Sequence, residues 1–242
     1  MGRKWIRCGE AMSEPSPRAF SRQVEPAPSG DPPPKLEPSI HALLAPLLAE
    51  DGFSGSGRIF RRLDRDLTLV VAVSGTRYGG EIALSIGLQP IAAPLEPPVS
   101  RGKLTTTHCE FSRDLGPAEN DGRWRYQPTR EAMDAAMGAA AETYRAFGRP
   151  FLQIMAGPFS PLRTATPQDF RDGARHFQVF RQTPVRMARA LVHMRLTAGD
   201  RSAASGFARF ALDDIGDGMA GSALVPELRA ILEACQETCQ EA

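Results

Sequence analysis

Lysine is almost missing from this chain, since only three of its 29 basic residues are lysines and the others are arginines. Arginine and alanine are encoded by GC-rich codons, so the bias is typical of a GC-rich bacterial genome rather than of a special arginine chemistry. The formal net charge is only +1 over 242 residues. The chain as a whole therefore has no general attraction for nucleic acid or for an anionic membrane surface.

Cysteine is also rare, and the four copies (Cys8, Cys109, Cys235 and Cys239) form no C-x-x-C pair. Cysteines scattered in this way predict no disulfide framework and fit a reducing compartment. No apolar run approaches the roughly 20 residues that a membrane-spanning helix requires. No apolar segment follows the charged N-terminus, as it would in a signal peptide. The sequence therefore predicts a cytoplasmic protein that has no membrane partner.

Common catalytic motifs are missing as well. The chain contains no G-x-S-x-G nucleophile elbow and no Gly-Lys-Ser/Thr phosphate loop. The glycines between Gly52 and Gly57 follow a predicted helix and precede a strand, which is the reverse of a phosphate-loop context, so we interpret them as a turn. His108 and Glu110 form an H-x-E, but the P-C-x-x-C that completes a deaminase zinc site does not follow. We therefore predict no cofactor and no metal.

Proline is abundant at the N-terminal end. Residues 1–38 contain eight prolines, with serine, glycine and mixed charges between them. Such a segment buries too little apolar surface to offset its ordering entropy, so we predict a disordered extension over 1–38. Residues 39–242 are then expected to form one domain, because 42% hydrophobic content is enough for a substantial core.

A helix and an alternating region open that domain. The helix is expected over 39–51, with Ser39 as its N-cap and Gly52 closing it. Strands are then indicated by apolar residues at every second position, which is typical of an antiparallel sheet with one covered face. The expected strands are Arg58–Leu63, Leu67–Val73, Glu81–Leu88, Leu104–Arg113 and Trp124–Tyr126, with turns at 64–66, 74–80 and 116–122. Cys109 and Phe111 would lie on the same face of their strand.

From Thr129 onward the apolar residues recur at helical spacing. A buried stripe is predicted for the first of these helices, which Gly148 and Pro150 would end: Met133, Met137, Ala140, Tyr144 and Phe147. Phe151–Pro161 is expected to be irregular. Further helices are predicted after the N-caps Thr166, Thr183 and Asp200, and a last one runs to Cys239.

The order of these elements predicts an α+β fold. It has an N-terminal helix, an antiparallel sheet of about four to five strands, and a helical C-terminal half packed on or beside the sheet. The helix and sheet occupy residues 39–127, and the helical part occupies residues 128–242.

Several segments resemble the bacterial domain of unknown function 4304 family. The segments are Leu47–Phe53, Gly57–Arg62, Val70–Ser74, Ile82–Leu88, His108–Gly116 with Trp124 and Tyr126, and Gly199–Ala204. Ile59 stands where the family usually has threonine, and Ser74 and Ser85 stand where it has glutamine and asparagine. The resemblance covers roughly residues 39–235. It implies the fold and a bacterial origin, and no activity, because none is established for the family.

Charge is unevenly distributed over the helical half. Residues 166–209 hold eight arginines and three acidic residues, whereas residues 210–242 hold one arginine and seven acidic residues. Arg186, Arg189 and His193 share a helix face at positions i, i+3 and i+7. The first interpretation is mutual neutralisation, in which the acidic last helix packs beside the basic ones. The alternative is a basic surface for an acidic protein or for nucleic acid.

Three functions remain open at this point. The preferred hypothesis is a non-catalytic binding or accessory module whose partner is another protein, because no catalytic constellation is assembled. An enzyme of unidentified class, with a cleft between sheet and helices, and a weak nucleic-acid binder are the alternatives. The candidate surface residues are Arg58, Arg61, Arg62, His108, Glu110, Trp124, Arg186, Arg189 and His193.

Overall fold

The computed structural model describes residues 34–76, 80–117, 121–173, 175–216 and 221–240. The predicted extension over 1–38 therefore lies almost wholly outside the described residues, as does part of the predicted loop at 74–80. Within the described part of the chain, no helix is both long enough and apolar enough to cross a membrane.

The predicted α+β architecture is confirmed, and the sheet is fully antiparallel. Its strands are β1 (Ser54–Ser56), β2 (Ile59–Asp64), β3 (Leu67–Gly75), β4 (Glu81–Pro90), β5 (Phe111–Leu115) and β6 (Arg123–Arg125). The first five are paired in chain order, and β6 pairs with β4 beyond the end of β5. The short strand β1 adds to the expected strands, because part of the turn at Gly52–Gly57 pairs with β2.

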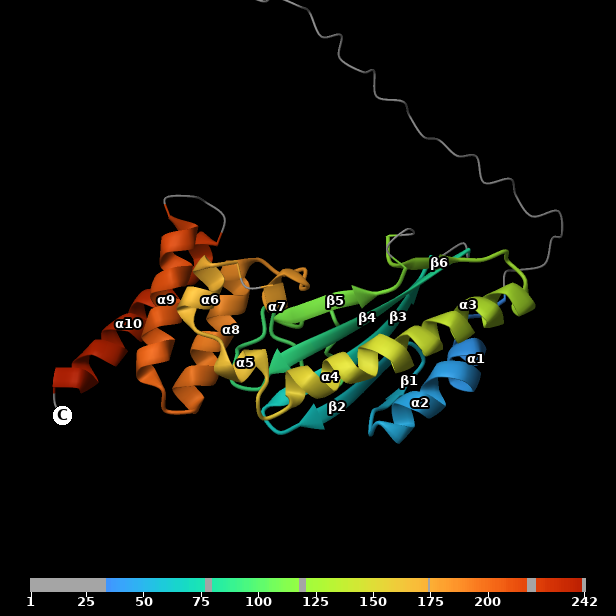
Figure 1. Cartoon of the computed structure of the whole chain (residues 1–242), viewed down its shortest axis with the longest axis horizontal. Helices are drawn as coiled ribbons and strands as arrows, with labels where there is room; N and C mark the ends of the chain where they lie inside the picture. Colours follow the sequence, from blue (N-terminus) through green and yellow to red (C-terminus); the bar gives the residue numbers. More distant parts are fainter. Residues whose placement is uncertain (1–33, 77–79, 118–120, 174, 217–220, 241–242) are drawn as a thin grey trace, which may run out of the picture. The chain divides into compact units, whose positions relative to one another are not determined.

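Helices flank the sheet and dominate the second half of the chain. They are α1 (Glu37–Ser39), η1 (Ile40–Leu44), α2 (Ala45–Glu50), η2 (Arg101–Lys103), α3 (Arg130–Thr143), η4 (Tyr144–Gly148), α4 (Arg149–Ala156), α5 (Pro161–Thr164), α6 (Pro167–Arg171), α7 (Arg175–Gln178), α8 (Pro184–Thr197), α9 (Arg201–Ile215), η5 (Ser222–Leu224) and α10 (Val225–Gln240). The segments α3 and α4 run along one face of the sheet beside α1 and α2 (Figure 1).

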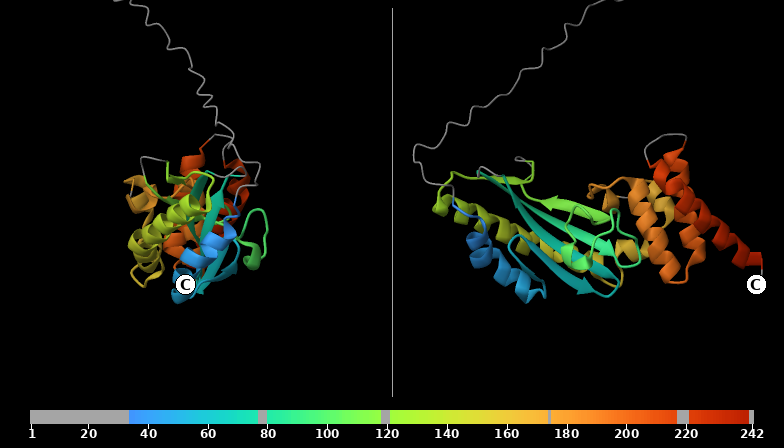
Figure 2. Two further views of the ribbon diagram at one scale, coloured as in Figure 1. Left: turned by 90° about the vertical axis from the view of Figure 1, so that its right-hand side faces the viewer. Right: turned by 180° about the vertical axis from the view of Figure 1, so that it is seen from behind.

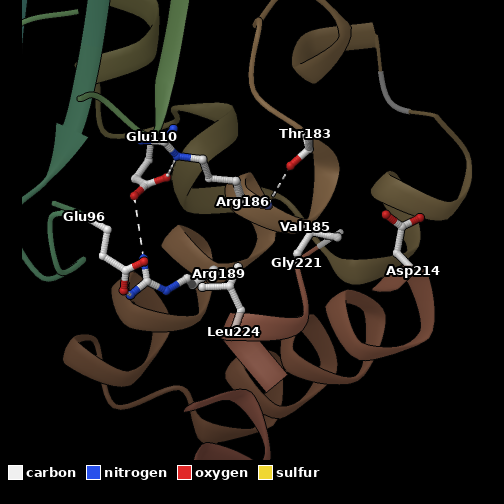
Figure 3. A pocket seen from close by; sticks show the side chains of 9 residues that line it. All are labelled: Glu96, Glu110, Thr183, Val185, Arg186, Arg189, Asp214, Gly221 and Leu224. Atoms are coloured by element: carbon white, nitrogen blue, oxygen red, sulfur yellow. Dashed lines mark hydrogen bonds and ion pairs between the residues drawn. The ribbon is translucent and has the colours of Figure 1, made fainter. Parts of the chain in front are cut away.

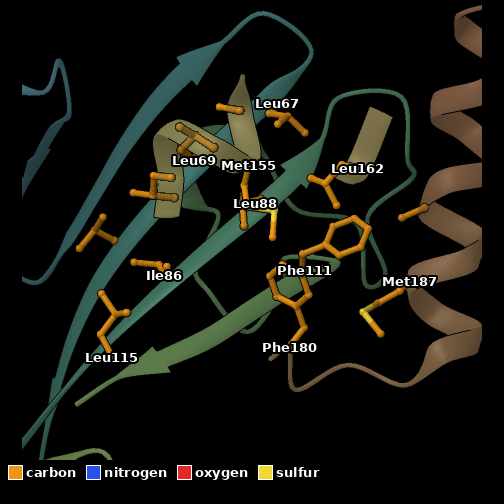
Figure 4. Close-up of a cluster of buried hydrophobic side chains, with 14 of the residues drawn as sticks. Leu67, Leu69, Ile86, Leu88, Phe111, Leu115, Met155, Leu162, Phe180 and Met187 are labelled. Carbon is orange, nitrogen blue, oxygen red and sulfur yellow. The ribbon is translucent and has the colours of Figure 1, made fainter. Parts of the chain in front are cut away.

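The main core lies between this sheet face and the helices. Leu67 and Leu69 of β3 and Leu88 of β4 are fully buried there. Figure 4 shows these side chains around Met155 of α4, and further along the core Met187 of α8 lies near Phe111 of β5. Each fully buried side chain of this size contributes about 1.5–3 kcal/mol relative to exposure, so this layer holds the helices on the sheet.

The opposite face of the sheet is covered too, contrary to the expectation of one covered face. Residues 91–110 pass over it as a loop, which is visible when the molecule is seen from behind (Figure 2). A small cluster of Val70, Leu104 and Cys109 is buried under this loop. The predicted strand over 104–113 was therefore wrong in its first half, because only Phe111–Leu115 pairs with β4. Cys109 consequently lies in this small cluster and not in the main core with Phe111.

Two helices continue through a proline because a wide turn precedes it. The π-helical turns η1 and η4 end two residues before Pro46 and Pro150. A proline lacks the N–H group, and its ring clashes with the carbonyl four residues earlier in an α-helix. The π turn shifts the backbone pairing to the carbonyl five residues earlier and relieves this conflict. The predicted helix end at Gly148 was therefore wrong, and the helix runs on to Ala156.

The N-cap predictions mostly hold. Thr166, Thr183 and Asp200 each accept a hydrogen bond from the backbone N–H three residues later. Ser39 is the exception, because the helix begins at Glu37 and Ser39 is buried inside it. Pro38 occupies the first turn, where a missing N–H carries no penalty.

Candidate functional site

Three of the predicted residues, Glu110, Arg186 and Arg189, meet where the sheet contacts helix α8 (Figure 3), and His193 is linked to them through Glu227. Glu110 precedes β5, and its carboxylate accepts a hydrogen bond from Nε of Arg186 at 2.6 Å. A second arginine, Arg189, lies 3.8 Å from the same carboxylate. The side chains of Glu110 and Arg189 are only 1% and 4% exposed, so both charges are withdrawn from water.

Local sequence explains why α8 presents these groups together. Thr183 caps the helix by accepting a hydrogen bond from the Arg186 N–H, and Pro184 fits its first turn. The spacing i, i+3, i+7 then aligns Arg186, Arg189 and His193 along one face. That face is turned toward acidic groups and is not free.

Acidic residues from two other segments complete this charged cluster. Arg189 donates to Glu96 and to Glu227 at 2.8 Å each. Nε2 of His193 lies 2.6 Å from the carboxylate of Glu227. Because Glu227 belongs to α10, the acidic last helix does neutralise basic groups of α8. Burial of unpaired charges would be costly, and this reciprocal pairing avoids that cost.

A cavity of about 370 Å³ opens beside the cluster. Glu96, Glu110, Arg186 and Arg189 line it on one side, and Asp214, Gly221 and Leu224 line it on the other. The cavity lies between the loop over 91–110 and the helices α8 and α9, whereas the enzyme hypothesis expected a cleft between sheet and helices. The charged groups Glu110, Arg186 and Arg189 are, however, already paired with one another or with Glu96 and Glu227.

Burial also shifts the pKa values of Glu110 and of its neighbour Cys109. Loss of hydration raises the pKa of Glu110, and Arg186 opposes that shift. Burial raises the pKa of the neighbouring Cys109 thiol as well, far above neutral pH. A protonated, buried thiol is a poor nucleophile. Among the described residues, no three histidine, cysteine or carboxylate side chains are grouped so that they could hold a metal ion.

The other predicted residues do not join this cluster. Arg58 pairs with Glu37 at 2.9 Å, and Arg61 donates to the carbonyl of Leu104 at 2.7 Å. Nδ1 of His108 accepts a hydrogen bond from the Thr105 N–H, and only the His108 carbonyl contacts Arg186.

The remaining two are part of the structural framework. Arg62 donates to the carbonyl of Asp51 at 2.7 Å and lies over the ring of Phe53. Trp124 is partly buried against the main core. The candidate set therefore divides into one buried cluster at α8 and several isolated contacts around the sheet.

A second, apolar surface lies outside the set of predicted candidate residues. We define the α4 ridge as Phe147, Phe151 and Ile154, which follow one another at about one helical turn along η4 and α4. Phe147 and Ile154 are 68% and 61% exposed, Phe151 is partly buried, and Phe159 in the turn after α4 is 88% exposed. The sequence placed Phe147 on the buried stripe. The π turn η4 overturned this prediction because its wider winding shifts the helical phase and turns Phe147 outward. The only signal for the π turns in the sequence was the presence of Pro46 and Pro150 at stretches of helical periodicity.

Arg113 of β5 lies beside the α4 ridge. Its guanidinium carbon is 4.8 Å from the ring centroid of Phe151, and that ring also contacts Phe180 edge-on. The ridge is therefore joined to β5 of the sheet through the contact between Arg113 and Phe151.

Comparisons with known proteins identify one part of the chain. Residues 44–154 match the model of DUF4304, a domain of unknown function. No curated protein and no solved structure matches the chain. The matched segment includes the sheet, Glu110 and α4, whereas Arg186, Arg189 and Glu227 lie beyond it. Of the residues 39–235 over which the resemblance was stated, the family model confirms 44–154: this segment is DUF4304-like, and the charged cluster attaches the C-terminal helices to it.

Proposed function

We propose that this protein is a non-catalytic protein-binding module that docks a partner protein on the α4 ridge. One observation carries the proposal. Of the five large apolar side chains that are exposed in the described part of the chain, three belong to residues 147–159. Isolated exposed apolar residues are common, but clustered ones mark interaction surfaces.

The composition of the α4 ridge supports this interpretation. Aromatic residues and arginine are enriched at the centres of protein interfaces, whereas lysine and acidic residues are depleted there. The ridge contains two phenylalanines, and one of them, Phe151, contacts Arg113. Phe147 and Ile154 lie on either side of Phe151 at i−4 and i+3, so one partner surface can contact all three.

The charged cluster is assigned a structural role in this proposal. Its arginines are already paired within the protein, so a partner would have to break those pairs before it could use them. The same consideration disfavours α8 as a surface for nucleic acid. The cysteine usage of the chain supports action in a reducing cytoplasm, and its arginine and alanine usage supports a bacterial origin.

A pull-down with matched variants tests the proposal. The full chain and its Ile154→Ser variant serve as baits in a lysate of the native host, and retained proteins are quantified. Leu63→Ser is the control, because Leu63 is 65% exposed and Ile154 is 61% exposed, but Leu63 lies on β2 outside the ridge. We expect at least one protein to be retained by the wild type and the control but lost from Ile154→Ser. Equal retention by all three baits would contradict docking on the ridge.

A further inference from the structure

We propose that the partner segment that docks on the α4 ridge is acidic and places a carboxylate on Arg113 while its apolar side chains cover Phe147 and Ile154. This inference rests on the proposed function and specifies the chemistry of the partner. It follows from the position, the pairing and the surroundings of one arginine.

The position of Arg113 is fixed by the sheet. Arg113 pairs with Ile86 in the ladder between β4 and β5, and Phe111 and Leu115 on either side face the main core. Its side chain therefore leaves the sheet on the helix side and lies over the ring of Phe151, 4.8 Å from the centroid. Stacking on an aromatic face orients the guanidinium without using its hydrogen-bond donors.

Arg113 has no acidic partner within the described part of the chain. Its side chain forms no ion pair or hydrogen bond with the described residues, and its Nε atom is buried without an acceptor. Neighbouring arginines differ in this respect, because Arg145 pairs with Glu142, Arg149 with Asp51 and Arg181 with Asp114. Arg113 is thus a half-buried cation whose compensating charge is missing.

Burial makes this missing charge energetically important. Loss of hydration on burial disfavours the charged form and lowers the pKa of Arg113, and no carboxylate of the described residues pairs with the side chain to offset this shift. A carboxylate brought in by a partner would supply that stabilisation through charge-assisted hydrogen bonds to the guanidinium. These bonds become stronger when the apolar ridge around them is covered and water is excluded.

The surroundings favour a protein segment over a nucleic acid as the source of the negative charge. The guanidinium of Arg113 lies over the ring of Phe151, which contacts Phe180 edge-on, and Phe147 and Ile154 lie about one helical turn to either side of Phe151. These side chains need apolar contacts to be covered. A phosphate backbone would leave those side chains exposed. A short segment with one aspartate or glutamate next to two apolar residues satisfies both requirements.

A peptide-display selection tests the proposal with a defined probe. Random 12-residue peptides displayed on phage are selected on the immobilised full chain, and the enriched peptides are synthesised and titrated. We expect enriched sequences to combine an acidic residue with at least two apolar ones. Arg113→Gln should weaken their binding about tenfold or more, which is the effect of losing one good charge-assisted contact. Replacing the acidic residue of the peptide by its amide should produce a similar loss.

Matched variants separate this inference from the proposed function. Arg145→Gln is the control, because Arg145 adjoins the ridge but already pairs with Glu142; it should change binding less than about twofold. Peptides that lose binding with Ile154→Ser but not with Arg113→Gln would overturn the acidic partner and leave docking on the ridge intact. Peptides insensitive to both variants, or the absence of enriched peptides, would overturn both proposals.

Two further measurements check alternative occupants and folding. Concentration-dependent dimerisation that Ile154→Ser abolishes would identify a second copy of the chain as the occupant and contradict the inference. Retention on DNA that depends on Arg113 would contradict it as well. Arg113→Lys keeps the charge but weakens the stacking and the bidentate geometry, so it should bind more weakly than wild type and more tightly than Arg113→Gln.

Discussion

The carboxylate of Glu110 and the guanidinium of Arg186 lie 2.6 Å apart, although 76 residues separate them in the sequence. Glu110 belongs to the DUF4304 segment, and Arg186 belongs to the helices that follow it. This pair therefore links two parts of the chain, and its removal should be measurable as a loss of stability.

Replacing Arg186 by methionine should lower the free energy of unfolding by about 3 kcal/mol, because Glu110 would remain buried with only Arg189 nearby. The double variant Glu110→Gln/Arg186→Met should lose less than the sum of the two single variants, since no uncompensated charge remains. Urea denaturation of the four proteins gives the coupling energy. A coupling near zero would show that the pair contributes nothing to the contact between sheet and helices.

Substituting Gly87 by alanine should lower the free energy of unfolding by about 1–3 kcal/mol. A Cβ at Gly87 would lie 2.6 Å from Sγ of Cys109, which is a severe overlap in the small cluster. Adding Cys109→Ala should recover part of the loss, because it removes the nearest atom. Gly138→Ala is the control, since Gly138 lies inside α3 with nothing within 4 Å, and it should instead gain about 0.5–1 kcal/mol.

The stabilising effect of Asp169 should depend on pH. Its carboxylate accepts hydrogen bonds from the backbone N–H and the hydroxyl of Thr166, and these lower the pKa of Asp169 below its ordinary value of 3.8. A lowered pKa in the folded state means that this stabilisation is complete above pH 3.8 and is lost as the pH falls through the lowered value. The stability advantage over Asp169→Asn should therefore shrink on acidification. An advantage that stays constant down to pH 2 would contradict the charged cap.

Changing Ile154 to serine should leave the free energy of unfolding within about 0.5 kcal/mol of wild type, because the side chain is 61% exposed. Thermal denaturation followed by circular dichroism checks this. The result matters for the binding experiments, since a loss of partner binding can be attributed to the ridge only when the variant is as stable as wild type. A marked loss of stability would instead assign Ile154 to the core.

Local signals in the sequence determined most of the secondary structure. Strands β3 and β4 follow from their alternating apolar residues, and helices α6, α8 and α9 start after the caps Thr166, Thr183 and Asp200. A cap involves atoms within three residues, and alternation involves nearest neighbours. Such interactions can be inferred without knowledge of the rest of the chain.

The tertiary structure alone decided which residues face one another and which face solvent. The sequence grouped Arg186, Arg189 and His193 on one face, but the identity of their partners, Glu110 and Glu227, depended on how the helices pack. The tertiary structure also showed that the α4 ridge faces solvent, because a π turn that accommodates Pro150 changes the phase of the helix. Ion-pair choice and exposure depend on contacts between distant segments, whereas caps and periodicity depend on neighbours. Local order could therefore be predicted here, and the exposure of the α4 ridge could not.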